Sequence, residues 1–256
     1  MHKATLLTGV VLLIAIAADA GRIYSADFTS GTYGTGGLDG QDGWDSQGSS
    51  IIAGIGVTEN GYAASVNGAS NNQSAVANGE TYESTITFNF NDLSGGLKSG
   101  PIIGAAIFNG NTVSSTLING VLKSQNSGAF RLSLHSNWGN VNTSIGIAQS
   151  PAFPAAALGL TYGEDTASDQ LSLSLSMTAG MDATSWNATV SLYNGATQIL
   201  TWTPTSSNLR FDASTVYGGF VYGQSDSNQS VGDRVITSYG FSSTNPKLDT
   251  LGLITD

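Results

Sequence analysis

One short segment of the sequence combines a cation, a titratable imidazole and a nearby aromatic ring. In FRLSLH, residues 130–135, apolar residues occupy the even positions, and Arg131, Ser133 and His135 occupy the odd ones. Successive side chains of a β-strand point to opposite faces, so these three residues are predicted to share one polar face, with Trp138 in the turn beyond. Such groups can bind a sugar, which makes Arg131, His135 and Trp138 candidate carbohydrate-binding residues. Ordinary outward-facing polar residues on a strand are the alternative.

Sugar binding without catalysis also requires an exposed aromatic ring that stacks on the sugar, with polar groups beside it. Trp44 and Trp138 lie in polar segments rich in turn residues, so they are the candidate stacking residues. Trp186 and Trp202 fall at apolar positions of predicted strands, and we expect them in the core.

Asp27 and Asp233 are the candidate ligands for a calcium ion, the one cofactor that the sequence suggests. Calcium requires several oxygen ligands at about 2.4 Å. Asp27 ends the first predicted strand and Asp233 precedes the last, so they meet if the terminal strands pair. Solvated acidic loops are the alternative. A zinc site is excluded, because the sequence has no cysteine and His135 is its one histidine beyond residue 20.

The elements that position these residues are predicted to be β-strands. In residues 169–194, apolar residues alternate with Ser in the first half and with Asn, Thr and Ser in the second. Each half therefore has one apolar and one hydroxyl-rich face, as in an antiparallel hairpin. About a dozen such segments, separated by turn signals such as Asn60-Gly61, Asn109-Gly110 and Asn119-Gly120, predict two packed antiparallel sheets. We expect an all-β sandwich or jelly roll with little or no helix.

Composition and charge exclude some classes of partner. The chain of 256 residues is 40% hydrophobic, which suffices for one sizeable core. Its formal net charge is −10 and it has only 8 Lys and Arg residues, so it lacks the clustered cations that nucleic-acid binding requires. The same charge argues against docking on anionic lipid.

The first twenty residues have the pattern of a secretory signal peptide. His2 and Lys3 precede an apolar run that extends from residue 4 to residue 18, and small residues occupy the cleavage site before Gly21. Residues 1–20 are thus predicted to be removed, which leaves residues 21–256 as a single domain. An uncleaved membrane anchor is the alternative. We expect the mature chain to be secreted or extracellular, or associated with the cell surface, and not embedded in a membrane. The absence of cysteine fits bacterial secretion.

Two stretches carry a family resemblance. Residues 28–44, FTSGTYGTGGLDGQDGW, follow a strand that ends in Asp-Phe and contain a Gly-Gln-x-Gly-Trp element, and GDRVI, residues 232–236, precedes the last predicted strand. Together with the hairpin that contains Trp186, they resemble secreted bacterial proteins with a concanavalin A-like lectin/glucanase (LamG-like) jelly roll. The resemblance implies that fold. It selects no activity, because the superfamily includes lectins, carbohydrate-binding modules, glycosidases, lyases and structural domains.

Two enzymatic branches of that superfamily have recognisable residue patterns. The glucanase branch places its carboxylates on one strand as Glu-x-Asp-x-x-Glu, whereas Glu80 and Glu83 differ by an odd number and would face opposite ways on a regular strand. The lyase branch pairs a Tyr and a His with an Arg and an amide. Arg131 and His135 supply two of these groups, but the surrounding residues do not match the Gln-x-His element of the lyases.

The function that we predict is noncatalytic recognition of a polysaccharide or glycan, outside the cell or at its surface. The alternative is a structural cell-surface, matrix or filament-forming protein, because strands rich in Ser, Thr, Asn and Gly with few charges suit self-association. A polysaccharide lyase or glycosidase of the same fold ranks third.

Overall fold

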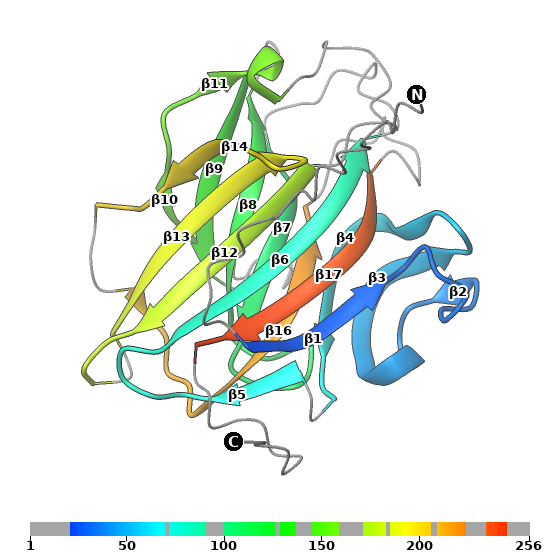
Figure 1. Ribbon diagram of the computed structural model, residues 1–256, viewed down its shortest axis with the longest axis horizontal. Helices are drawn as coiled ribbons and strands as arrows, with labels where there is room; N and C mark the ends of the chain where they lie inside the picture. The colour runs from blue at the N-terminus through cyan, green and yellow to red at the C-terminus, as the bar shows by residue number, and fades with distance from the viewer. Residues whose placement is uncertain are drawn as a thin grey trace, which may run out of the picture.

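The computed structural model describes most of the chain beyond residue 20. The described ranges are 21–69, 72–90, 100–125, 129–136, 145–158, 171–182, 185–205, 209–223 and 234–244. They form 17 β-strands, which antiparallel pairing joins into one sheet, and two short 3-10 helices, η1 (Gln41–Gly43) and η3 (Ala155–Leu158). Figure 1 shows that the sheet folds over into two layers. No helix in these ranges is long and apolar enough to cross a membrane.

The first layer faces the viewer in Figure 1 and contains the first and last strands of the chain side by side. Its strands, in spatial order, are β1 (Gly21–Asp27), β17 (Arg234–Ser243), β6 (Thr81–Phe90), β12 (Leu171–Ala179), β13 (Ser185–Asn194) and β14 (Thr197–Trp202). The short β15 (Leu209–Arg210) also pairs with β13. The predicted hairpin is confirmed as β12 and β13, whose residues pair from Leu171↔Asn194 to Ala179↔Trp186.

The second layer lies behind the first. Its strands, in spatial order, are β2 (Gly36–Gly37), β3 (Trp44–Ile52), β4 (Gly56–Asn67), β16 (Thr215–Tyr222), β7 (Gly100–Phe108), β8 (Leu117–Gln125), β9 (Ala129–Ser136) and β10 (Ile145–Gln149). The short β5 (Gln73–Ala75) pairs with β16, and β11 (Phe153–Pro154) pairs with β9. The layers join where Val57 of β4 pairs with Ile236 of β17.

The main hydrophobic core fills the space between the layers, and strand alternation decides which residues enter it. On β9, Phe130, Leu132 and Leu134 point inward and are buried. On β12 and β13, the apolar members of the predicted hairpin are also buried in this core, including Trp186. Burying one large apolar side chain contributes about 1.5–3 kcal/mol, so this alternation drives the formation of the sandwich. The predicted all-β, two-sheet sandwich is confirmed.

A second, smaller apolar cluster lies on the outer face of the second layer. It comprises Ala64, Val66, Ala106, Phe108, Leu117, Val121 and Val221. The connection between β7 and β8 packs against it through Val113, whose backbone N–H donates to Asp45 Oδ2 at 2.6 Å. The outer face of this layer is therefore not simply a solvated surface.

Two predicted turns lie inside strands instead. Asn60-Gly61 belongs to β4, and the chain reverses at residues 53–55. Asn119-Gly120 belongs to β8, where Asn119 pairs with Ala106 of β7 on one side and with His135 of β9 on the other. Strand pairing on both sides satisfies the backbone hydrogen bonds of β8, and this outweighs the local preference of Asn-Gly for a turn.

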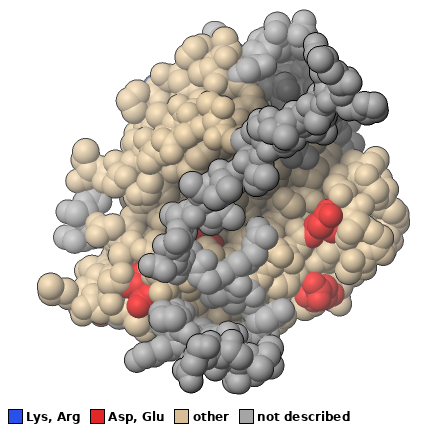
Figure 2. Space-filling model, in the orientation of Figure 1, with Lys and Arg blue, Asp and Glu red and all other residues tan. Residues whose placement is uncertain are grey.

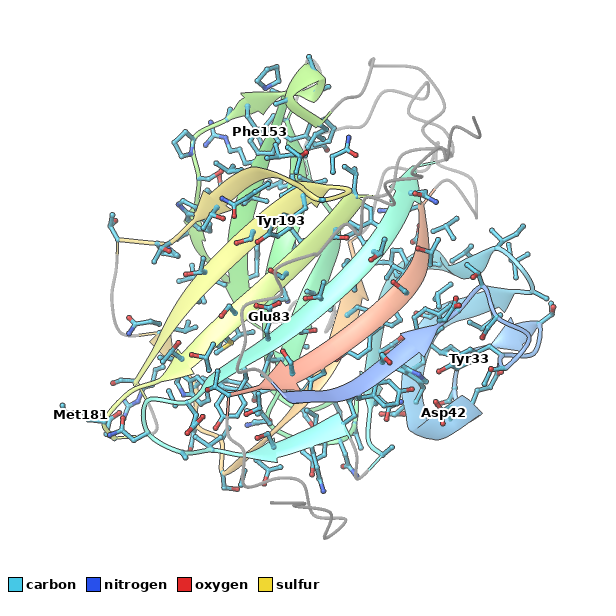
Figure 3. All side chains as sticks on the ribbon, viewed as in Figure 1. Tyr33, Asp42, Glu83, Phe153, Met181 and Tyr193 are labelled. Carbon is cyan, nitrogen blue, oxygen red and sulfur yellow. The ribbon has the colours of Figure 1, made fainter. Side chains whose placement is uncertain are left out.

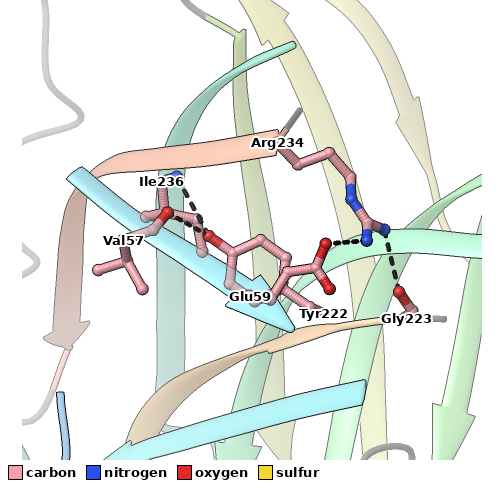
Figure 4. A network of polar contacts seen from close by, with 6 residues as sticks. All are labelled: Val57, Glu59, Tyr222, Gly223, Arg234 and Ile236. Carbon is pink, nitrogen blue, oxygen red and sulfur yellow. Dashed lines mark hydrogen bonds and ion pairs between the residues drawn. The ribbon is translucent and has the colours of Figure 1, made fainter. Parts of the chain in front are cut away.

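A buried ion pair holds β17 against β4 near the junction of the layers (Figure 4). Arg234 Nη2 donates to Glu59 Oε1, and Arg234 Nη1 donates to the carbonyl of Gly223 at 2.9 Å. The guanidinium lies 5.9 Å from the ring centroid of Tyr222, whose hydroxyl donates to the carbonyl of Val57 at 2.7 Å. Buried charges are tolerated only when they are paired, so this network defines how the two strands meet.

Candidate functional site

Five polar side chains gather on the outer face of the second layer, where β8 and β9 run side by side. They are Asn119 and Lys123 of β8 with Arg131, Ser133 and His135 of β9, and we call them the β8–β9 polar cluster. Asn119 lies directly opposite His135, and Lys123 lies directly opposite Arg131. They share this face because they alternate along each strand with residues that point the other way.

Two members of the cluster are buried with unused hydrogen-bonding capacity. Asn119 and Ser133 are fully buried, and among the described residues neither the amide nitrogen and oxygen of Asn119 nor the hydroxyl of Ser133 has a hydrogen-bond partner. Arg131 is half-buried, and its Nε also lacks a partner in the part of the chain that the structure describes. A buried polar group without a partner costs about 1–3 kcal/mol, so natural proteins contain few of them. A ligand that supplies the missing bonds would explain why four such atoms lie together.

His135 completes the cluster as a neutral hydrogen-bonding group. Its side chain is 6% exposed, and burial, with a smaller contribution from the charge of Lys123, lowers its pKa to about 4. At neutral pH the imidazole therefore has one donor and one acceptor nitrogen. A group with so low a pKa is a weak base, so His135 is better suited to hydrogen bonding than to proton abstraction.

Lys123 and Arg131 give the cluster a positive charge in an acidic chain. Like charges directly opposite each other on neighbouring strands are destabilising. Within the described ranges, neither side chain forms an ion pair with a carboxylate. The pair therefore presents cationic donors to the oxygen atoms of a ligand.

The predicted residues of this strand lie together, although they are less accessible than we expected. Arg131 and His135 share one face with Ser133 between them, as the alternation predicts, but His135 and Ser133 are buried. Trp138 falls outside the described residues. Sequence analysis missed Asn119, because Asn-Gly is a strong turn signal. The apolar run of residues 116–122, which continues on both sides of Asn119, was the signal that could have placed it on a strand.

The prediction that Trp44 is an exposed stacking residue is wrong. Trp44 begins β3, is 2% exposed, and packs against Phe28, Phe220 and Tyr239 at ring-centroid distances of 5.7, 5.1 and 5.2 Å. The polar segment before it folds back on itself, because Gln41 hydrogen-bonds to the backbone of that segment and Gly43 adopts a positive φ of 78°. The ring is thereby directed into the core, and it presents no exposed face on which a sugar could stack.

The terminal strands pair, which is the condition under which Asp27 and Asp233 would meet, but only Asp27 belongs to the residues that the structure describes. Asp27 is exposed at the end of β1, opposite Ser238 of β17. Asp233 lies outside the described residues. In the part of the chain that the structure describes, no group of three or more His, Cys, Asp or Glu side chains could hold a metal ion.

The outer face of the first layer is a second polar surface, and its side chains are mostly hydroxyls. Cross-strand hydrogen bonds between hydroxyls join Thr81 to Thr178 at 2.8 Å and Thr87 to Ser172 at 3.2 Å, between β6 and β12. Figure 3 shows Glu83 near the centre of this face. A groove of about 340 Å³ lies beside it, between β1, β17 and β6. Its described charged side chains include the carboxylates of Asp27 and Glu83, whereas those of the β8–β9 polar cluster are cations.

Comparison with known proteins identifies the fold. No protein-family model matches the chain, and no curated protein matches its sequence. Three similar solved structures are arcelin-5, a lectin-like defence protein from Phaseolus vulgaris, a peanut lectin bound to a peptide, and a basic winged bean lectin bound to the Tn-antigen. Their identities to this chain are 10%, 11% and 12%, and their TM-scores are 0.53, 0.52 and 0.51.

These structures match over nearly their whole length. The matches cover 86%, 86% and 87% of this chain, and 97%, 97% and 99% of the arcelin-5, peanut lectin and winged bean lectin chains. At such low identity the likeness establishes the fold alone. The chain thus has the concanavalin A-like sandwich that legume lectins share, which agrees with the fold that the sequence resemblance implied.

Proposed function

We propose that this protein recognises a carbohydrate without catalysis, and that the β8–β9 polar cluster is its binding site. The observation that carries the proposal is the unused hydrogen-bonding capacity of Asn119, Ser133 and Arg131 at one place. A sugar hydroxyl both donates and accepts hydrogen bonds, and it therefore matches an amide that needs both kinds of partner.

Each member of the cluster has a distinct part in this proposal. The amide of Asn119 accepts from one hydroxyl and donates to another, Ser133 does the same with its single hydroxyl, and Arg131 donates through Nε. The imidazole of His135 stays neutral at physiological pH and adds one donor and one acceptor. Because this pKa is too low for an effective general base, the arrangement favours binding over bond cleavage.

The wider context of the proposal comes from the sequence. The first twenty residues act as a secretory leader, and residues 21–256 meet their glycan outside the cell or at its surface. The lectin-like fold is compatible with this role, and the partly exposed side chains of Lys123 and Arg131 are where a sugar would enter the cluster and reach its buried members.

The proposal is tested by screening the purified protein against an array of glycans, with and without calcium. The decisive variant is Asn119→Val, and its matched control is Asn187→Val, at an exposed position of β13 on the other layer. We expect selective binding that Asn119→Val abolishes and Asn187→Val retains. Binding that both variants retain would place the site elsewhere. Failure to bind any glycan, with elution as a large assembly in size-exclusion chromatography, would instead support a structural, self-associating protein.

A further inference from the structure

The groove on the first layer is a separate site, on the outer face opposite to that of the β8–β9 polar cluster. It has a volume of about 340 Å³, and the side chains that define it lie on β1, β6 and β17. They include those of Ser25, Asp27, Thr85, Thr87 and Ser238, while Gly240 contributes backbone atoms alone. We call this feature the Asp27 groove.

The groove exists because a glycine interrupts a row of hydroxyls. Gly240 of β17 pairs with Ser25 on one side and with Thr85 on the other. Neighbouring strands are about 4.8 Å apart, so the missing side chain leaves a hollow between the two hydroxyls. In the next row along the strands, Ser238 lies between Asp27 and Thr87, which places the carboxylate at the end of the hollow.

Hydrogen bonds favour the charged form of the Asp27 carboxylate. Its Oδ1 accepts from the backbone N–H of Thr29 at 2.9 Å and from the hydroxyl of Thr29 at 2.6 Å. These bonds lower the pKa of Asp27, with the side-chain bond contributing most. Both hydrogen bonds are accepted by the same oxygen, Oδ1. Because the residue is exposed, a ligand can still reach the carboxylate.

The surroundings of the groove are acidic as well. Glu83 follows on β6 and accepts from the hydroxyl of Thr85 at 3.2 Å. Over β1, β17 and β6, Figure 2 shows Asp and Glu but no Lys or Arg among the described atoms in view. With a formal net charge of −10 on the chain, this face favours a cationic ligand over an anionic one.

We propose that the Asp27 groove binds an amino sugar, with the protonated amine of the sugar on the carboxylate of Asp27 and its hydroxyls on Ser238 and Thr87. An ammonium group has three donors, so one can meet the carboxylate and the others the hydroxyl oxygens beside it. A calcium ion fits less well, because it takes six to eight oxygen ligands and the groove offers one carboxylate. The site is independent of the function proposed for the β8–β9 polar cluster.

A pair of ligands that differ only in charge tests this proposal. Oligomers of glucosamine carry protonated amines, whereas oligomers of N-acetylglucosamine of the same length do not. Calorimetric titration of the purified protein should show binding of the glucosamine oligomers that weakens with added salt, and no binding of the acetylated ones in this groove. Equal affinity of both ligands for the groove would overturn the amine assignment.

Two variants locate the binding. Asp27→Asn keeps the shape and the acceptor for Thr29 but removes the charge, and it should weaken glucosamine binding about tenfold or more. Gly240→Thr fills the hollow with a residue that suits a strand, and it should remove binding while the fold stays intact, as thermal unfolding would show.

Variants on the opposite face separate this proposal from the previous one. Asn119→Val should leave glucosamine binding unchanged. Loss of that binding in Asn119→Val but not in Asp27→Asn and Gly240→Thr would show that the amine is bound at the β8–β9 polar cluster, and it would refute the groove as the site. Absence of any glucosamine binding to the original protein would refute it as well, without bearing on a glycan bound at the cluster.

Discussion

Asn119 of β8 and His135 of β9 lie directly opposite each other on the outer face of the second layer. The first is fully buried, and its amide has no hydrogen-bond partner within the described ranges. The second is buried with its pKa lowered to about 4. The unsatisfied amide reduces the stability of the folded chain at any pH, whereas the buried imidazole reduces it only as the pH falls below the ordinary pKa of histidine. Residues that lower stability at one place are a reason to look for a function there.

Removing the amide of Asn119 should make the protein more stable. Val suits a strand, and the neighbouring positions Leu117, Val121 and Ala106 are apolar. Asn119→Val therefore replaces an unsatisfied polar group by one that the site can pack, and the free energy of unfolding should rise by about 1–2 kcal/mol. Urea denaturation measures this change, with Asn187→Val as the control. A lower stability of Asn119→Val would mean that the amide has partners in solution.

Because of His135, the free energy of unfolding should also decrease as the pH decreases. Its pKa is about 4 in the folded state, below the ordinary value of 6.5, so the unfolded chain takes up the proton first. As the pH falls from about 6.5 to about 4, the original protein should lose up to about 3 kcal/mol relative to His135→Gln. Urea denaturation of both proteins over this range measures the difference. Equal pH dependence of the two would contradict the burial of a neutral imidazole.

Trp44 should affect stability and leave sugar binding unchanged. Its ring packs against Phe28, Phe220 and Tyr239 in the core, so Trp44→Ala should lower the free energy of unfolding by about 3–5 kcal/mol. The fraction of the variant that remains folded should bind glycan with the original affinity, which calorimetry can measure. If the variant is fully folded and its affinity for the glycan is lower, Trp44 belongs to the binding site after all.

The buried pair of Arg234 and Glu59 should show strong coupling. Arg234→Met leaves a buried carboxylate without its cation, and we expect a loss of about 3–5 kcal/mol of stability. Adding Glu59→Gln removes that charge and should restore part of the loss. A double-mutant cycle by denaturation measures the coupling. Additive effects of the two substitutions would show that the pair contributes little.

A structural feature could be predicted from the sequence when residues close together in the chain determine it, and was missed when residues far apart in the chain determine it. The β12–β13 hairpin was predicted because its alternation of apolar and hydroxyl residues is a local property. Asn119 was misplaced because its conformation depends on pairing with β7 and β9, which local sequence does not encode. Trp44 was misplaced for a related reason, since the polarity of the preceding segment says nothing about the direction of the ring.

The two polar surfaces differ in the same way. Arg131 and His135 could be assigned to one face because both lie on a single strand. The Asp27 groove requires β1, β17 and β6 in a particular register, with Gly240 between Ser25 and Thr85. Those three residues are far apart in the sequence, and no spacing rule connects them.

The most direct test of the proposed carbohydrate site is an NMR titration that follows the imidazole of His135. The chain has two histidines, His2 and His135, so the spectrum is simple and His135→Gln assigns the signal. Adding a glycan selected by the array should shift the resonances of His135 in proportion to the bound fraction that calorimetry measures. A glycan that binds by calorimetry while those resonances stay unchanged would contradict recognition at the β8–β9 polar cluster.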